Sequence, residues 1–315
     1  MKVTIILALL VGFAACEQQR SPLDKAAAVR PTTAGSQAPA ALRQAPAVLK
    51  IDRSGTVEQQ LARLQDAYDR NAEAIDFLNK VYAQQVAQDR ETPAPDAMFA
   101  VDVAEDVKAG QVDGPAGAPV TIVEAFDFAC PYCRQASPMM EELVKEYAGK
   151  VRVVYTNLLV HPPARAAHLA SCAAAKQGKY MAFKDAFWDK GFGPYAASGG
   201  KDASSLGQDS ILAIARGIGL SAEKLEADMS SRACAQRLQD DMRQMQKFHV
   251  GSTPTFFING RVVDGLLPKA QFEQIIDEEV EKVERSGVPA AQYYDRVVLA
   301  RGEKQFRSKI DPRPD

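Results

Sequence analysis

The chain has 315 residues and an apolar content of 46%, which is enough to bury one large core or two modest ones. Its 38 basic residues are nearly balanced by 40 acidic ones, and the formal net charge is −2. This balance excludes the basic footprint of a nucleic-acid-binding protein, so no nucleic-acid partner is expected.

The first residues are typical of an export signal. Lys2 precedes an apolar stretch over 3–15, which is too short to span a bilayer but suits the apolar region of a signal peptide. The stretch ends in Phe13-Ala14-Ala15-Cys16, which resembles the lipobox of bacterial lipoproteins, although Phe13 stands where leucine is preferred. We expect a signal peptide over 1–15 and lipidation of Cys16. The alternative is a plain signal peptide with Cys16 left as a free thiol.

The next two segments differ sharply in composition. Residues 16–54 are rich in Ala, Pro, Gln and Ser and are expected to form a flexible tether. Over 55–91, helix formers dominate, and residues recur at alternating four- and three-residue steps: Val57, Leu61, Leu64, Tyr68, Asn71, Ile75, Leu78, Tyr82 and Gln85. This spacing predicts an amphipathic helix with a heptad seam. Two interpretations stay open: a coiled coil that makes the protein a homo-oligomer, or a single helix packed on the folded domain.

The rest of the chain alternates strand-like and helix-like segments. In order these are a strand over 119–128, a helix over 141–147, a strand over 151–155, a helical block over about 160–248, strands over 255–258 and 261–264 joined by Asn259-Gly260, a helix over 271–285 and a tail over 286–315. The tail is expected to be peripheral. The order predicts an α/β fold in which a helical insertion splits the β-sheet.

The motif Cys130-Pro131-Tyr132-Cys133 follows the first strand directly. Two cysteines at this spacing can close a small disulfide ring. The first of them lies at a helix N-terminus, where backbone amides stabilise a thiolate. Since the thiolate is the attacking form in disulfide exchange, the motif indicates redox chemistry. The alternative is half of a zinc site, but the sequence contains no second C-x-x-C and no H-x-x-H.

The chain has five cysteines, of which four remain if Cys16 is lipidated. In an oxidising compartment an even number favours pairing. Cys172 and Cys234 either form a structural disulfide or are separate small buried side chains. We expect the disulfide, because closing so long a loop is worth roughly 4 kcal/mol in the chain-entropy view.

Together these motifs resemble the DsbA-like branch of the thioredoxin superfamily, over about 101–285. The match rests on the run over 118–124 before the Cys pair and on Gly251-Ser252-Thr253-Pro254-Thr255-Phe256-Phe257 at the start of the hairpin. The resemblance implies a thioredoxin fold with a helical insertion. It also implies that Pro254 is a cis-proline facing the Cys pair and that Thr253 binds a substrate strand. The alternative is a trans proline that begins an edge strand.

Glu124 lies six residues before Cys130, and this even offset places it on the strand face of Phe126. A carboxyl on an apolar face beneath the Cys pair has a raised pKa and can exchange a proton with Cys133. The resemblance to the family's buried acid supports this role. The alternative is a solvent-facing Glu124, with Asp127 on the opposite face as an exposed residue.

The resemblance implies a protein thiol:disulfide oxidoreductase that needs no cofactor. We expect Cys130 to be the exposed nucleophile and Cys133 the buried resolving thiol. Pro131 and Tyr132 are expected to contact substrate. Since neither carries a positive charge, the Cys130 thiolate should be less stabilised than beside a histidine. The histidines His161, His168 and His249 are expected on the surface, and no metal site is expected.

The expected partners are reduced or unfolded exported proteins and a membrane redox protein that resets the Cys pair. We expect the protein in the cell envelope, facing the periplasm or the exterior. Whether it acts as an oxidase or as an isomerase or reductase stays open. Two other functions stay open: a tethered substrate-binding or chaperone module with the same fold, and an exported copper or zinc carrier that uses the Cys pair.

Overall fold

The computed structural model of the protein describes residues 54–312. The chain divides into two compact units, Met1–Gln84 and Gln85–Asp315, and each is described by itself. The expected signal peptide over 1–15, the expected lipidation site Cys16 and the expected tether, up to residue 53, lie outside the described residues.

A helix, α2 (Val57–Glu91), occupies the range in which an amphipathic helix was expected. It begins with a reciprocal cap, in which the Gln59 side chain accepts from the Thr56 N–H at 3.1 Å and the Thr56 hydroxyl accepts from the Gln59 N–H at 3.4 Å. Seven apolar seam residues have exposed fractions between 36% and 76%: Val57, Leu61, Leu64, Tyr68, Ile75, Leu78 and Tyr82. Within residues 54–312, no helix is both long and apolar enough to cross a membrane.

The second unit is built on a five-stranded sheet in the order β1-β3-β2-β4-β5. The strands are β1 (Val112–Asp113), β2 (Val120–Phe126), β3 (Val151–Asn157), β4 (Thr255–Ile258) and β5 (Arg261–Asp264). β2 and β3 are parallel, and the other neighbouring strands are antiparallel. This topology confirms the expected mixed α/β fold.

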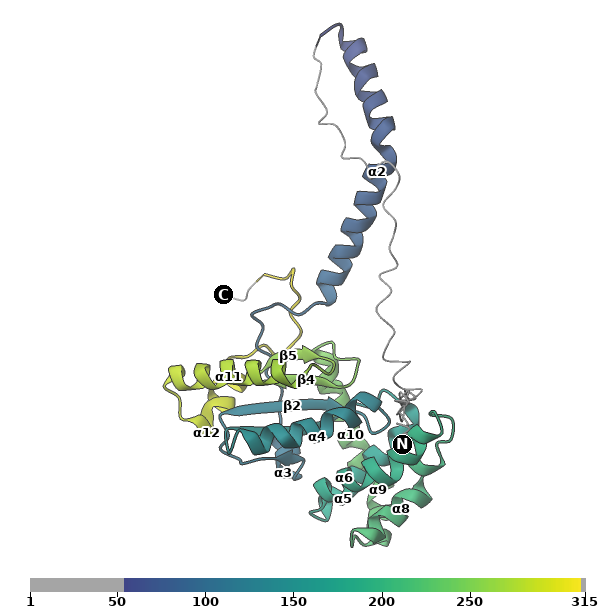
Figure 1. Ribbon diagram of the computed structural model, residues 1–315, viewed down its shortest axis with the longest axis vertical. Coiled ribbons are helices and arrows are strands. Elements are labelled where there is room, and N and C mark those ends of the chain that lie inside the picture. Colours follow the sequence, from purple (N-terminus) through teal and green to yellow (C-terminus); the bar gives the residue numbers. More distant parts are fainter. Residues whose placement is uncertain (1–53, 313–315) are drawn as a thin grey trace, which may run out of the picture. The chain divides into compact units, whose positions relative to one another are not determined.

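Ten helices of the second unit are α3 (Ala104–Lys108), α4 (Pro131–Glu146), α5 (Arg165–Lys176), α6 (Tyr180–Phe187), α7 (Gly193–Ala197), α8 (Gln208–Gly217), α9 (Ala222–Met229), α10 (Arg232–Lys247), α11 (Lys269–Ser286) and α12 (Ala290–Tyr293). Helices α5 to α10 all lie between β3 and β4 in the sequence, as the expected insertion requires. Figure 1 shows α5, α6, α8 and α9 gathered in one group, while α4 and α11 run along the strands of the sheet.

The central strand β2 is buried along its whole length. Side chains of a strand alternate between the two faces of its sheet. Ile122 and Phe126 therefore share one face, where they belong to a core that includes α4, α11 and the insertion. Val123 and Ala125 lie on the other face, in a second core. Glu124 is on the face of Ile122 and Phe126, the face that also receives the Cys pair.

The β4–β5 hairpin confirms the expected strands and turn. Asn259 and Gly260 both have positive φ, 46° and 86°, as a two-residue hairpin turn of the primed kind requires. A Cβ on Gly260 would lie 2.7 Å from the backbone oxygen of Phe99. Only glycine fits this close approach between the turn and an earlier segment of the chain.

The tail over 286–315 is not peripheral, and this expectation was wrong. Three of its hydrophobic side chains are buried, namely Tyr293, Tyr294 and Val298. The Tyr294 hydroxyl donates to the Val101 carbonyl at 2.8 Å, and the Phe306 ring stacks on the Phe99 ring at 6.2 Å. The segment that covers the tail lies about 200 residues earlier in the chain, so no local pattern marks the contact.

Candidate active site

The two cysteines of the motif lie at the junction of β2 and α4. Cys130 precedes the helix in an extended conformation, and Pro131 takes the first helical position, where its missing N–H costs no hydrogen bond. Both cysteines are free thiols. Their exposed fractions are 3% for Cys130 and 0% for Cys133. The expectation of an exposed Cys130 was therefore wrong, because its sulfur lies against Thr253 at the start of the hairpin.

The segment before β4 forms the other wall of the site. In its protonated form, the Cys130 thiol donates to the Thr253 carbonyl oxygen at 3.2 Å. The Thr253–Pro254 peptide bond is cis. Pro131 and Tyr132 are exposed, Tyr132 by 50%. The structure thus brings Cys130 and Thr253 into contact, with Tyr132 at the accessible edge of the motif.

The surroundings of Cys130 favour its thiolate. Its pKa is lowered to about 6, above all because the Cys133 thiol donates a hydrogen bond to it. The Thr253 side chain and the backbone N–H groups of Cys133 and Tyr132 lower the pKa further, while burial opposes them. The Thr253 hydroxyl is buried and makes no hydrogen bond within the described residues, which leaves its O–H available to a Cys130 thiolate. Cys130 is therefore largely ionised at neutral pH.

Cys133 is tuned in the opposite direction. Burial raises the pKa of the Cys133 thiol well above its ordinary value, and the nearby Glu124 carboxyl raises it further. Glu124 is itself 2% exposed, and burial raises its pKa to about 8. At neutral pH the pair thus presents one thiolate, one thiol and a protonated carboxyl beneath them, which is an arrangement that can return a proton to the inner sulfur.

Lys184 is a buried residue near this acid that sequence reasoning missed. It lies on α6 with an exposed side-chain fraction of 1%, and its ammonium stands 4.9 Å from the ring centre of Tyr155, the β3 neighbour of Glu124. Its hydrogen bonds go to the Ser137 hydroxyl at 3.2 Å and the Asp185 carboxylate at 2.6 Å. Its positive charge acts against burial and lowers the pKa of Glu124. The sequence around Lys184 does not indicate that it acts on Glu124, because the two residues lie far apart along the chain.

The alternative in which Glu124 faces solvent and Asp127 is exposed does not hold. Asp127 is fully buried, and its carboxylate accepts from the backbone N–H groups of Ala129, Val160 and His161, each at 2.7 Å. The Asp127 carbonyl also accepts from the Cys130 N–H at 3.0 Å. Asp127 thereby ties the loop that carries Cys130 to the loop after β3. The sequence signal for this role is the Asx turn, in which an Asp side chain accepts from the backbone N–H two residues later.

The three histidines differ in burial. His249 is exposed and His161 is half-buried, but His168 is only 1% exposed, so its expected surface position was wrong. Its ring packs against those of Phe126 and Phe128, with centroids 5.8 and 5.1 Å away. Burial lowers the pKa of His168 to about 4, so it is neutral at neutral pH. Within residues 54–312, no three or more His, Cys, Asp or Glu side chains are grouped to hold a metal ion.

Cys172 and Cys234 are joined by a disulfide, with their Cα atoms 5.6 Å apart and a sequence separation of 62. The bridge links α5 to α10 within the helical insertion. It therefore holds together the part of the fold that covers the site rather than taking part in it.

Comparison with known proteins places the chain among thioredoxins. A family model described as thioredoxin matches residues 106–278. The Na(+)/H(+) antiporter NhaA 3 of Salinispora tropica is 37% identical over 174 residues, which cover 53% of this chain and 23% of the antiporter. The chain thus spans about a quarter of the length of this curated relative.

Two solved structures are similar to somewhat more than half of the chain. A thioredoxin-like oxidoreductase from Silicibacter pomeroyi is 30% identical, with a TM-score of 0.46, over 54% of this chain and 91% of that one. BdbD from Bacillus subtilis is 20% identical, with a TM-score of 0.46, over 59% of this chain and 98% of that one.

Proposed function

The chain belongs to the thioredoxin family, and on this basis we propose that it is a protein thiol:disulfide oxidoreductase whose reactive pair is Cys130 and Cys133. The observation that carries the proposal is the opposite tuning of the two thiols, with a lowered pKa at Cys130 and a raised pKa at Cys133. A structural disulfide needs no such asymmetry, whereas exchange is favoured when one sulfur is a good leaving group and the other is held as a thiol after the bond breaks.

The chemistry begins with the oxidised pair. A substrate thiolate attacks the Cys130 sulfur, the bond between the two cysteines breaks, and its electron pair leaves on Cys133. Because the pKa of Cys133 is high, this sulfur takes a proton, which the protonated Glu124 carboxyl supplies. A second substrate thiolate then attacks the substrate sulfur of the mixed disulfide. Cys130 leaves as a stable thiolate, the substrate gains a disulfide and the Cys pair holds both electrons.

The proposal is tested with reduced or scrambled ribonuclease as substrate for the full chain and for Cys130→Ala. The wild-type protein should form or reshuffle the disulfides of ribonuclease, and the variant should not. Equal activity in both would exclude the enzyme and favour a chaperone-like module. Metal analysis of the reduced protein addresses the carrier alternative, since a stoichiometric bound ion would contradict the proposal.

The direction of the reaction follows from the reduction potential of the Cys130–Cys133 pair. A potential near that of thioredoxin, about −270 mV, excludes the oxidase role, whereas a much higher potential supports it. In either case the natural substrates we propose are reduced or unfolded exported proteins, and a membrane redox protein resets the pair. The apolar stretch over 3–15 and the small residues before Cys16 support export and a lipid anchor in the cell envelope.

We propose a second copy of this chain as the partner of α2. The support is the apolar seam, whose side chains are exposed along the helix at heptad spacing. Light scattering of the full chain should give a multiple of the monomer mass. Leu64→Lys, in the seam, should lower that mass, and Gln65→Lys, beside the seam, should leave it unchanged. A monomeric wild-type protein would contradict this proposal.

A further inference from the structure

A buried row of polar side chains leads away from the reactive pair. His168 Nε2 lies 4.0 Å from Asp127 Oδ1, and His168 Nδ1 lies 2.9 Å from Asn157 Oδ1. On its other side the Asn157 amide nitrogen donates to Asp241 Oδ2 at 2.8 Å. All four side chains are at most 3% exposed. The row therefore connects the loop of Cys130 to α10 through β3 and α5.

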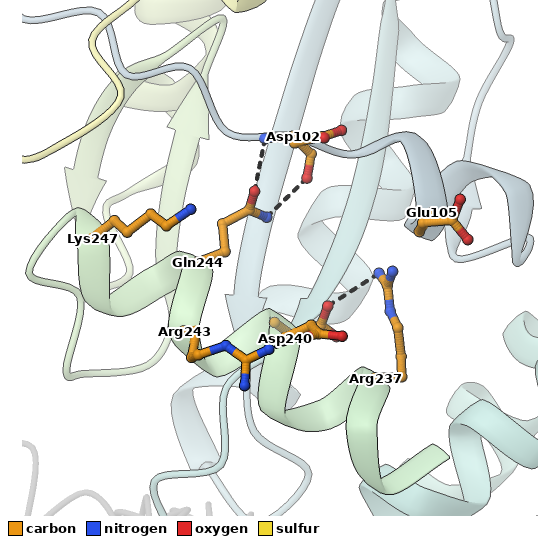
Figure 2. A pocket seen from close by; sticks show the side chains of 8 residues that line it. Asp102, Glu105, Arg237, Asp240, Arg243, Gln244 and Lys247 are labelled. Atoms are coloured by element: carbon orange, nitrogen blue, oxygen red, sulfur yellow. Dashed lines mark hydrogen bonds and ion pairs between the residues drawn. The ribbon is translucent and has the colours of Figure 1, made fainter. Parts of the chain in front are cut away.

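The far end of the row reaches the surface. Arg237 bonds to Asp241 Oδ1 at 3.1 Å and also to Asp106. Figure 2 shows Arg237 on α10, together with Asp240 and Gln244, at the edge of a hollow of about 310 Å³. Burial raises the pKa of Asp241 to about 6, while its ion pair with Arg237 and its hydrogen bond from Asn157 act against burial and favour the carboxylate. An ionised carboxylate only accepts hydrogen bonds.

This end of the row determines where the proton of His168 sits. Because Asp241 accepts, Asn157 must present its amide nitrogen to it, and the Asn157 oxygen then faces His168. An oxygen accepts only, so the proton of the neutral imidazole lies on Nδ1. Nε2 is left as a lone pair and has no hydrogen-bond partner among the described residues.

That lone pair faces another acceptor, Asp127 Oδ1. No hydrogen bond can form between them, so His168 does not draw the Asp127 carboxylate toward itself. The carboxylate instead accepts from the backbone N–H groups of Ala129, Val160 and His161. These bonds hold the loop that leads into Cys130 at the N-terminus of α4.

We propose that His168 is a positioning residue whose Nδ1–H tautomer, imposed by Asn157 and Asp241, keeps the Asp127 carboxylate on the loop of Cys130. The inference rests on the proposed function only in the reason why the loop of Cys130 must be held in place, which is the reaction at Cys130. The tautomer and the loop contacts can be measured whether or not the protein turns over a substrate.

The first test is the protonation of the His168 ring nitrogens in the full-length wild-type protein by NMR, assigned by comparison with His168→Phe. The proton should lie on Nδ1, and a proton on Nε2 would overturn the proposal outright. In Asp241→Asn, Arg237 should take the new side-chain oxygen and leave the amide nitrogen facing Asn157. Asn157 then turns over, and the His168 proton moves to Nε2.

The second test is the pH profile of Cys130 alkylation in the same proteins. Asp241→Asn should raise the midpoint by about half a pKa unit, which slows alkylation below the midpoint about threefold. Asp240→Asn is the matched control, since it removes a neighbouring exposed carboxylate from the same helix and should change neither readout. An altered tautomer with an unchanged alkylation profile would refute the positioning role. Loss of ribonuclease activity without these changes would refute only the proposed function.

Discussion

The two cysteine pairs of this protein show how surroundings decide what a thiol does. Cys130 and Cys133 are free, lie at the start of α4 and have pKa values shifted in opposite directions. Cys172 and Cys234 are bonded to each other across the insertion and lie within α5 and α10. The residue type is the same in both pairs. However, only the first pair faces hydrogen-bond donors that have no other acceptor, and only this pair lies beside the buried carboxyl of Glu124.

The difference lies in what each sulfur can gain from its neighbours. Backbone N–H groups at the N-terminus of α4 point at Cys130, and the Thr253 hydroxyl is available to it. In contrast, the backbone N–H of Cys234 is already bonded to the Ser231 hydroxyl that caps α10. The first pair can therefore cycle between thiol and disulfide, while the second pair stabilises the fold.

The largest expected effect separates the two pairs by activity. Cys130→Ser should lower disulfide exchange with reduced ribonuclease by at least about 100-fold, because no other group can form the mixed disulfide with substrate and then leave as a thiolate. The double variant Cys172→Ala, Cys234→Ala should keep most of the activity at temperatures where it stays folded. If the double variant loses activity as fully as Cys130→Ser while folded, the division of roles between the pairs is wrong.

The next effect concerns stability. Removing the Cys172–Cys234 bridge should lower the free energy of unfolding by about 4 kcal/mol, because the bridge closes a long loop in the unfolded chain. Urea unfolding of the double variant and of the wild type measures this. Reducing the Cys130–Cys133 pair should change stability much less, since that pair closes only a very short loop. A larger loss from the short loop would contradict this account.

Glu124 gives a pH-dependent effect. Its pKa rises on folding from 4.5 to about 8, so the folded protein holds a proton there that the unfolded chain has lost. The resulting stability is present below pH 4.5 and is lost as the pH rises through 8, by up to about 1.4 kcal/mol per pH unit. Glu124→Gln should remove this slope in urea unfolding measured across the window. Parallel curves for variant and wild type would mean that Glu124 ionises normally.

The smallest effect concerns the Thr253 hydroxyl. Thr253→Val keeps the carbonyl that contacts Cys130 but removes the hydroxyl that lowers its pKa. The midpoint of Cys130 alkylation should rise by about half a pKa unit, or threefold in rate below it. Ser252→Ala, at the neighbouring position, is the control. An unchanged midpoint in Thr253→Val would show that the hydroxyl does not reach the sulfur.

The parts of the site that the sequence predicted are those with local signals. The spacing of Cys130 and Cys133 and the turn at Asn259-Gly260 each lie within a few residues. Strand alternation alone placed Glu124 on the face of Phe126. In each case the residues that form the pattern are the same residues whose structure it predicts, so no knowledge of tertiary packing was needed.

The parts that could not be predicted depend on partners far along the chain. Asn157 meets Asp241 across 84 residues, and Arg237 meets Asp106 across 131. His168 is buried because it packs between β2 and the insertion. The pattern of apolar and polar residues within α5 does not reveal this packing. The tail was misjudged for the same reason, because its cover is the segment over 94–103.

The fold makes Cys130 a thiolate while keeping Cys133 protonated. The direct measurement is the rate of Cys130 alkylation against pH in the reduced full-length protein, with Cys133→Ala to assign the reacting sulfur. We expect a midpoint near pH 6 in the wild type and a higher midpoint once the Cys133 hydrogen bond is removed. A wild-type midpoint near that of an ordinary thiol, about 8.5, would contradict it.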